Sequence, residues 1–147
     1  TIDLFPTLAD LLNIRLLVQP DGVSLKSVLL EDITAQPRKE FYYYYRKNAL
    51  EAVRMDDWKL ILPHPGRTYE NFEIGQNGYP GKGNENAPFP QALYDLRRDP
   101  GERYDVQTQF PEIVKQLLEL ATRARADLGD ELVNETGKNR REPGRVQ

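Results

Sequence analysis

The sequence predicts an α+β domain in which about four antiparallel strands form a small sheet and a C-terminal helix packs on one face. Three observations lead to this prediction. Segments rich in aromatic and branched residues follow one another over residues 40–62 and return at 91–96. One short acidic turn, Asp56-Asp57, interrupts the first of these stretches, as in a β-hairpin. After Phe110-Pro111, apolar residues recur at helical spacing over several turns.

Composition narrows the class of protein. The 147 residues suit one domain, and 39% hydrophobic with 29% charged residues is typical of a folded globular chain. The net charge of -3 argues against nucleic acid as a partner, since nucleic-acid binding needs a basic surface. The absence of cysteine excludes disulfides, thiolate zinc sites and a cysteine nucleophile in this chain. No apolar run reaches the ~18 residues of a membrane span. The sequence opens without Met on an amphipathic pattern, so we expect it to start inside a longer protein.

Residues 1–39 are expected to form a short helix followed by a surface connection. The connection contains DGVSLKSVLL, which predicts a turn and then one or two helical turns. The helix is predicted over residues 3–13, where four apolar residues recur at helical spacing on one face: Leu4, Leu8, Leu11 and Leu12.

Four segments are expected to supply the strands. Asp56-Asp57 lies between the second and third of them; a metal pair is one interpretation, but adjacent acids before a strand are typical of a solvated hairpin turn. In the run Tyr42–Tyr45, alternation should send half of the rings into the core, and the alternative is stacking on a sugar or a base. The segments are EFYYYYR (40–46), LEAVRM (50–55), WKLIL (58–62) and QALYDL (91–96).

The remaining sequence is divided by its composition. Residues 63–90 are rich in proline and glycine and predict a long irregular loop, a feature that is often functional in compact domains. Pro111 suits a helix start and Gly129 a helix stop, which predicts a helix over residues 111–128. The expected organisation is a junction segment (1–39), a subdomain (40–130) and an extended tail of low apolar content (131–147).

Two groups of polar residues are candidates for chemistry. In PHPGRTYENF, at the start of the long loop, His64, Arg67 and Tyr69 are close enough in sequence to bind an anionic group, with the forked guanidinium of Arg67 as the main contact. The alternative is that His64 is only a loop residue at a strand end. The other group surrounds a Pro-Gly pair, lacks calcium-loop spacing and is expected to shape a β-turn: Asp95, Asp99, Glu102 and Asp105.

No complete active site is visible in this chain. A single histidine cannot build a histidine-rich zinc site, and neither Ser24 nor Ser27 lies in a Gly-x-Ser-x-Gly nucleophile turn. The glycine-rich NGYPGKGNENAP contains Lys82 but lacks the phosphate-loop pattern. The residues alone therefore predict an α+β domain with a long loop and without a catalytic or metal-binding set.

The order of five segments resembles the C-terminal part of sulfatases, in the arylsulfatase family of the alkaline-phosphatase-like superfamily. Each segment is short, but their order and spacing are specific. The proline-glycine pair of the loop, followed by DPGER, is most similar to the arylsulfatase A and galactosamine-6-sulfatase branch. The segments are TIDLFPTLADLLNI, PDGVSL, AVRMDDWKLIL, LYDLRRDPGERYDV and FPEIVKQLLELATRARADLGD.

The resemblance implies a parent enzyme that hydrolyses sulfate esters with calcium and a formylglycine made from a Cys/Ser-x-Pro-x-Arg motif. This chain lacks that motif, so the resemblance assigns it no catalytic or metal residue and implies that it is inactive alone. The implied partners are the protein's own N-terminal catalytic domain and a sulfated aryl or carbohydrate ester, contacted by His64, Arg67 and Tyr69. The helix of residues 4–12 would meet that domain or, in the isolated chain, a second copy. Sulfatases of this type are commonly exported, which implies a periplasmic, extracellular or lysosomal location.

Two other functions stay open at this point. A phosphodiesterase or phosphonate hydrolase of the same superfamily would differ in its nucleophile motif. A free-standing carbohydrate-binding module would use the tyrosine-rich sheet, and it would need exposed, coplanar rings and a core of its own.

Overall fold

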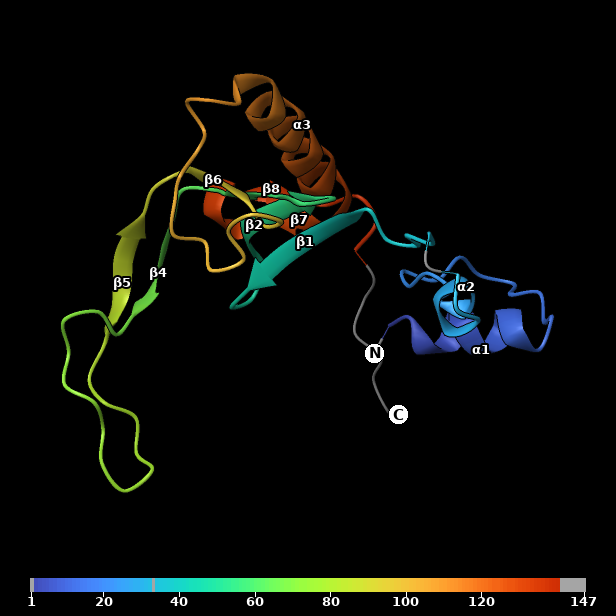
Figure 1. The fold of residues 1–147 in the computed structure, drawn as a ribbon, viewed down its shortest axis with the longest axis horizontal. Coiled ribbons are helices and arrows are strands. Elements are labelled where there is room, and N and C mark those ends of the chain that lie inside the picture. Colours follow the sequence, from blue (N-terminus) through green and yellow to red (C-terminus); the bar gives the residue numbers. More distant parts are fainter. Residues whose placement is uncertain (1, 33, 141–147) are drawn as a thin grey trace. The chain divides into compact units, whose positions relative to one another are not determined.

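The computed structural model describes residues 2–32 and 34–140 and divides the chain between Lys39 and Glu40 into two compact units (Figure 1). The N-terminal unit holds two short helices, and the C-terminal unit holds the sheet and a long helix. The predicted α+β class, with its four-stranded antiparallel sheet and C-terminal helix, is confirmed. None of the helices in the described part of the chain combines the length and apolar character that crossing a bilayer requires.

In the N-terminal unit, polar groups on and beside the first helix bond to the connection that follows it. The helices are α1 (Leu4–Leu11) and the single-turn α2 (Lys26–Leu29). Three acceptors on or beside α1 receive hydrogen bonds from the connection: Asp3 from the N–H of Val23 (2.8 Å), Thr7 from the N–H of Leu25 (2.9 Å) and Asp10 from the hydroxyl of Ser24 (2.6 Å).

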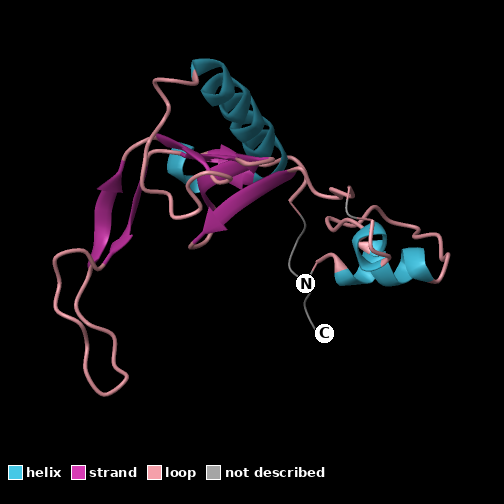
Figure 2. Ribbon diagram, in the orientation of Figure 1, coloured by secondary structure: helices cyan, strands magenta, loops and turns pink. Residues whose placement is uncertain are grey.

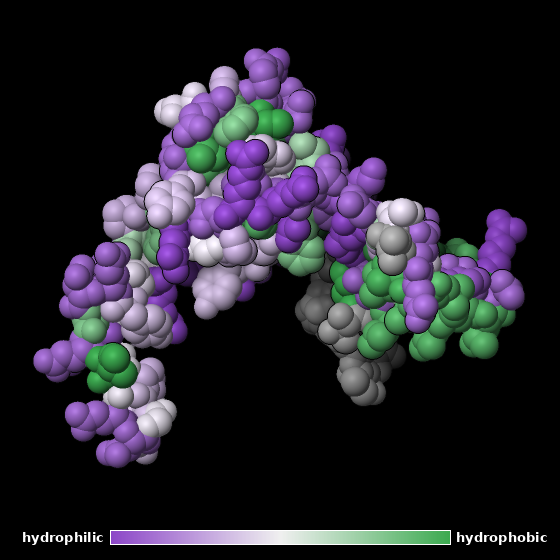
Figure 3. All heavy atoms as spheres, viewed as in Figure 1, coloured by the Kyte–Doolittle hydropathy of each residue, from purple (hydrophilic) through white to green (hydrophobic). Residues whose placement is uncertain are grey.

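The apolar side of α1 is exposed. Figure 3 shows hydrophobic residues gathered on the surface of this unit. The four leucines that predict the helix are all more than a third exposed, which is the arrangement expected of a helix that meets another apolar surface. We call them the leucine face: Leu4, Leu8, Leu11 and Leu12, which are 62%, 56%, 38% and 66% exposed.

Four antiparallel strands form the sheet of the C-terminal unit in the order β1-β2-β3-β6. Asp56 and Asp57 make the tight turn between β2 and β3, as predicted, and Asp56 has a φ of 51° that an acid tolerates better than most residues. The strands are β1 (Glu40–Tyr45), β2 (Ala49–Met55), β3 (Trp58–Ile61) and β6 (Ala92–Asp95).

One face of the sheet packs on α3 (Pro111–Leu128), which begins with proline in its first turn and ends before Gly129. Burying each leucine of this core contributes roughly 1.5–3 kcal/mol. Because α3 occupies this face, the opposite face remains available for other contacts. The buried residues of this core are Leu50, Val53, Leu60, Leu62, Leu93, Leu117, Leu120, Ala121 and Ala124.

The long loop is not irregular throughout, which corrects the prediction for residues 63–90. β4 (His64–Thr68) and β5 (Asn84–Phe89) pair as a two-stranded antiparallel ribbon, and residues 69–83 between them remain without helix or strand (Figure 2). Pro65 lies opposite Pro88 in this ribbon. A two-stranded ribbon leaves one edge of each strand unpaired, so it accommodates prolines that a central strand would exclude.

The expected extended tail also differs from the structure. β7 (Gly129–Asp130) pairs with β8 (Glu135–Thr136) around a short 3-10 turn, η1 (Glu131–Val133). Asp130 is fully buried and caps η1 by accepting a backbone hydrogen bond from within the turn. Residues 141–147 of the expected tail lie outside the described residues.

Candidate functional site

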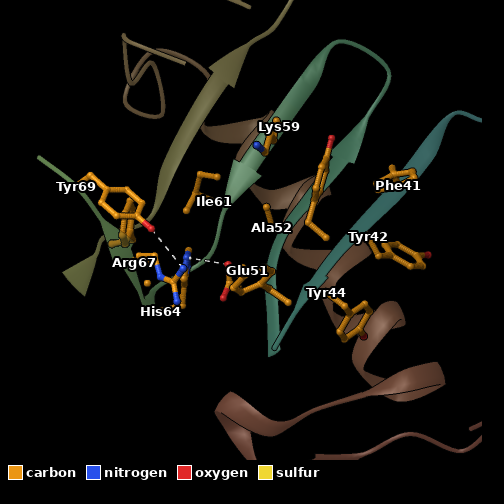
Figure 4. A pocket seen from close by; sticks show the side chains of 14 residues that line it. Phe41, Tyr42, Tyr44, Glu51, Ala52, Lys59, Ile61, His64, Arg67 and Tyr69 are labelled. Carbon is orange, nitrogen blue, oxygen red and sulfur yellow. Dashed lines mark hydrogen bonds and ion pairs between the residues drawn. The ribbon is translucent and has the colours of Figure 1, made fainter. Parts of the chain in front are cut away.

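A cleft lies on the sheet between β1 and the β4–β5 ribbon (Figure 4). Its volume of about 770 Å³ lies within the usual range of small-molecule sites, about 300–1,000 Å³. Ala52 of β2 and Ile61 of β3 lie between its two sides, and the small side chain of Ala52 leaves the space open. We call it the aromatic cleft, lined chiefly by the rings of Phe41, Tyr43, Tyr45, Tyr69 and Phe89 and by the polar residues Glu51, Lys59, His64 and Arg67.

The tyrosine run divides between the two faces of the sheet, as alternation predicts. Tyr42 and Tyr44 pack against the hydrophobic core. The rings of Phe41 and Tyr43 meet edge to face, with centroids 4.9 Å apart, and Lys59 Nζ lies 4.7 Å from the centroid of Tyr43. The interpretation as a stacking surface therefore applies only to the alternate rings that face the cleft.

The three residues singled out in the sequence, His64, Arg67 and Tyr69, all line the aromatic cleft. Arg67 donates hydrogen bonds from Nε to Oε2 of Glu85 at 2.8 Å and from a terminal nitrogen to the Tyr69 hydroxyl at 3.4 Å. The bond to Glu85, and after it the bond to Tyr69, raise the pKa of the Arg67 guanidinium above its usual value. Arg67 is therefore a cation that already has a carboxylate partner.

The imidazole of His64 is largely buried and is held on three sides. It stacks on the ring of Phe89, with centroids 5.3 Å apart and planes 8° from parallel. Its Nδ1 lies 2.6 Å from the carbonyl oxygen of Leu62, and its Nε2 lies 3.3 Å from Oε2 of Glu51. Both ring nitrogens thus lie next to an oxygen atom, one of the backbone and one of a carboxylate. Glu51, Leu62 and Phe89 together fix the position of the imidazole ring.

Glu51 reaches the cleft through a β-bulge in β2. The register between β1 and β2 changes from Tyr43 opposite Ala52 to Tyr44 opposite Leu50, which leaves Glu51 without an opposite residue. Bulges of this kind re-aim a side chain, and here the carboxylate points toward the ribbon (Figure 4). Among the described residues, Oε1 of Glu51 is the buried side-chain oxygen or nitrogen that lacks a hydrogen-bond partner.

Lys59 completes the polar lining. Its Nζ donates to both carboxylate oxygens of Glu102, at 2.7 and 2.9 Å. Glu102 belongs to the acidic turn after β6, so one acid of that turn contacts a residue that lines the cleft. Each basic side chain that lines the cleft is therefore paired with a carboxylate: Lys59 with Glu102, His64 with Glu51 and Arg67 with Glu85.

Other acids of the turn hold its backbone. Asp99 accepts hydrogen bonds from two successive backbone N–H groups, at 2.6 and 2.8 Å, and Asp95 accepts one from the N–H of Arg97 at 3.1 Å. Burial raises the pKa of Asp105, but hydrogen bonds from the backbone of Gln107 and Leu93 outweigh it, so the pKa lies below its usual value. These acids serve the β-turn expected from the sequence. Across residues 2–32 and 34–140, no three His, Asp or Glu side chains come together as a metal site requires.

Comparison with known proteins identifies similar chains. Residues 36–144 match the family model of the C-terminal region of aryl-sulfatase. The chain is 32% identical over 125 residues to N-acetylgalactosamine-6-O-sulfatase of Bacteroides thetaiotaomicron. This alignment covers 81% of the chain and 22% of that protein. It is 29% identical over 126 residues to arylsulfatase K of Gallus gallus, covering 79% of this chain and 20% of that protein.

A solved structure is also similar. It comes from work on how Bacteroides thetaiotaomicron metabolises multiple glycosaminoglycans, and it aligns with a TM-score of 0.60 and 28% identity. The alignment covers 84% of this chain and 24% of that one. The chain thus spans between a fifth and a quarter of the length of the proteins it matches, at 20% to 24%.

Proposed function

Because the chain belongs to the family of aryl-sulfatase C-terminal regions, we propose that it is the C-terminal part of a sulfatase that hydrolyses a sulfated carbohydrate. The match of residues 36–144 to this C-terminal region carries the proposal. The relatives are named as sulfatases, which favours this function over a phosphodiesterase or phosphonate hydrolase. A free-standing carbohydrate-binding module is also not favoured, because the family model describes one region of a larger enzyme.

The chemistry of ester hydrolysis would lie outside this chain. The chain has no cysteine, and neither Ser24 nor Ser27 begins a Ser-x-Pro-x-Arg motif that could yield formylglycine. The described residues also contain no cluster of three His, Asp or Glu side chains that could hold a metal ion. The nucleophile and the calcium would therefore belong to an upstream catalytic domain, and the chain alone would be inactive.

The aromatic cleft would contribute to substrate binding. One relative is named as an N-acetylgalactosamine-6-O-sulfatase, and the similar solved structure comes from work on glycosaminoglycans, which supports a sulfated sugar as the substrate class. The cleft brings together His64, Arg67 and Tyr69 beside exposed aromatic rings. In the parent enzyme these three residues would contact the sugar at the edge of the substrate site.

The leucine face would contact the upstream catalytic domain. Residues 1–35 precede the part of the chain that matches the C-terminal region. In this segment α1 turns its polar acceptors toward its own connection and leaves Leu4, Leu8 and Leu12 uncovered. A helix with that orientation is stabilised when another apolar surface covers it.

The first test is hydrolysis of a small aryl sulfate by this chain, alone and mixed with the separately produced upstream domain. We expect no turnover by the chain alone and turnover once the upstream domain is present. Turnover by the chain alone would contradict the proposal, because it would require a nucleophile within these residues.

The second test addresses the cleft in the full-length enzyme. We expect the double variant His64→Ala/Arg67→Ala to lower kcat/KM about tenfold or more on a sulfated sugar, and to leave turnover of a small aryl sulfate unchanged. Arg98→Ala is the matched control, because Arg98 is highly exposed and does not line the cleft. Unchanged kcat/KM on the sugar would show that the cleft does not contact the substrate.

A further inference from the structure

We propose that the aromatic cleft binds an uncharged pyranose ring of the substrate and not its sulfate group. This inference rests on the proposed function, since it assigns one part of the sulfated carbohydrate to the cleft. Its physical basis is the charge balance of the lining, the exposed rings and one carboxylate oxygen without a partner.

The two permanent cations of the cleft, Lys59 and Arg67, are already paired with carboxylates, and a third carboxylate lies beside His64. Lys59 Nζ lies 2.7 Å from Oε1 of Glu102, and Arg67 Nε lies 2.8 Å from Oε2 of Glu85. His64 has its Nε2 3.3 Å from Glu51. A sulfate group entering the cleft would approach a carboxylate wherever it approached a cation. It would then have to displace that carboxylate or accept its repulsion, so the lining does not favour an anion.

The rings of the cleft suit the apolar faces of a sugar. Tyr69 and Phe89 lie on one side and Phe41 and Tyr45 on the other, and all four are more than a third exposed. Aromatic side chains offer a large flat apolar surface, and their burial under a ligand is favourable. A pyranose presents C–H groups on its faces and hydroxyls at its rim, which matches flat rings beside polar groups.

Glu51 adds a preference for a hydrogen-bond donor. Its Oε2 is committed to His64, whereas its Oε1 is buried without a partner. A buried acceptor without a partner costs free energy that a ligand O–H or N–H group would recover. Sugar hydroxyls and acetamido N–H groups donate in this way, and a sulfate ester does not. The carboxylate therefore favours the neutral part of a sulfated sugar.

The test uses the whole chain, labelled with nitrogen-15 and carbon-13, and NMR titration with three probes at equal ionic strength. The probes are N-acetylgalactosamine, its 6-sulfate and sodium sulfate. We expect both sugars to shift the signals of Tyr69 and Gly66 with dissociation constants within roughly threefold of each other, and sodium sulfate to leave them unmoved. A preference of about tenfold or more for the sulfated sugar, equal shifts with sodium sulfate, or no shift with any sugar would overturn the proposal.

Two variants in the cleft and one control outside it locate the binding. Tyr69→Ala should weaken binding of the neutral sugar, whereas Tyr79→Ala should not, because Tyr79 is an exposed ring of the same loop outside the cleft. Glu51→Gln should also weaken it, since an amide oxygen is a poorer acceptor than a carboxylate. Equal binding by all three variants would overturn the assignment to the cleft.

The outcomes separate this inference from the proposed function. A tenfold preference for the sulfated sugar would leave the cleft as a substrate contact and remove only the assignment of the neutral ring. Failure of the full-length enzyme to hydrolyse any sulfate ester would instead remove the proposed function, whatever the titrations show.

Discussion

The hydroxyl of Tyr44 donates a hydrogen bond of 2.8 Å to the carbonyl oxygen of Gly129, 85 residues later in the chain. It thereby joins β1 to the residue that follows α3. Tyr44→Phe keeps the ring and removes the bond, so we expect a loss of about 0.5–1.5 kcal/mol in the free energy of unfolding. Urea denaturation measures it, with Tyr45→Phe as the control because Tyr45 is exposed. Equal stability of Tyr44→Phe and the unmodified chain would contradict the prediction.

The same hydroxyl should make the fold less stable at alkaline pH. Burial, and after it the negative charge of Asp130, raise the pKa of Tyr44 from 10.0 to about 12. As the pH rises above about 10, the tyrosine of the unfolded chain loses its proton before that of the folded chain. The stability of the folded state therefore falls until about pH 12. We expect the unmodified chain to lose more stability than Tyr44→Phe between about pH 9 and about pH 11. Parallel losses in the two proteins would show that other groups dominate in this range.

Asp130 is a fully buried carboxylate that links the two ends of the C-terminal unit. It accepts a hydrogen bond from the N–H of Leu50 at 3.2 Å and one from Nε of Arg125 at 2.9 Å. Asp130→Asn keeps the shape but leaves Arg125 without its counter-charge, which should cost roughly 3 kcal/mol. Thermal and urea unfolding measure this cost. Asp57→Asn in the β2–β3 turn is the control, and a similar loss in the control would contradict the interpretation.

The parts of the fold that could be predicted from the sequence are those in which one local pattern dominates. The strand-forming run over residues 40–62 and the apolar stripe of α3 appear at the predicted positions, with ends that differ by about one or two residues. The β4–β5 ribbon could not be predicted. Its prolines and glycines remove the alternation of apolar residues that signals a strand, and its pairing depends on the path of the whole loop.

The candidate site shows the same division. His64, Arg67 and Tyr69 could be grouped because they lie within one short stretch of sequence. Glu51 and Lys59 could not, because sheet register and a bulge bring them to the cleft, and no local pattern reveals either. One signal was available in ALEAV, where the charge of Glu51 interrupts an otherwise apolar run at the position that proves to be the bulge.

Two glycines with positive φ allow backbone strain to be separated from steric exclusion. Gly129 has a φ of 83° and Gly78 a φ of 78°. A Cβ atom on Gly129 would lie 2.7 Å from backbone atoms of Glu135 and Gly137, whereas one on Gly78 would meet nothing within 4 Å. Both alanine variants should lose about 1–2 kcal/mol to strain, and Gly129→Ala should lose clearly more because of the clash. Equal melting temperatures of the two variants would contradict this difference.

The leucine face should govern how the N-terminal unit associates. Three of its leucines are more than half exposed, and covering such a surface contributes about 25 cal/mol for each Å² of apolar area removed from water. We therefore expect the isolated chain to self-associate with increasing concentration. The triple variant Leu4→Ser/Leu8→Ser/Leu12→Ser should remain monomeric in sedimentation equilibrium, because it lacks this apolar area. The variant should still fold, because the hydrogen-bond acceptors on and beside α1 are unchanged.

A control and a second measurement decide which partner the leucine face prefers. Leu17→Ser is the control, because Leu17 is 99% exposed but lies outside α1. If the upstream catalytic domain is the true partner, adding this domain should dissociate the self-associated chain. The triple variant should then fail to bind the domain. A triple variant that still binds the upstream domain with unchanged affinity would show that the domain contacts another surface, because a stripe of serines cannot replace the apolar area that the leucines bury.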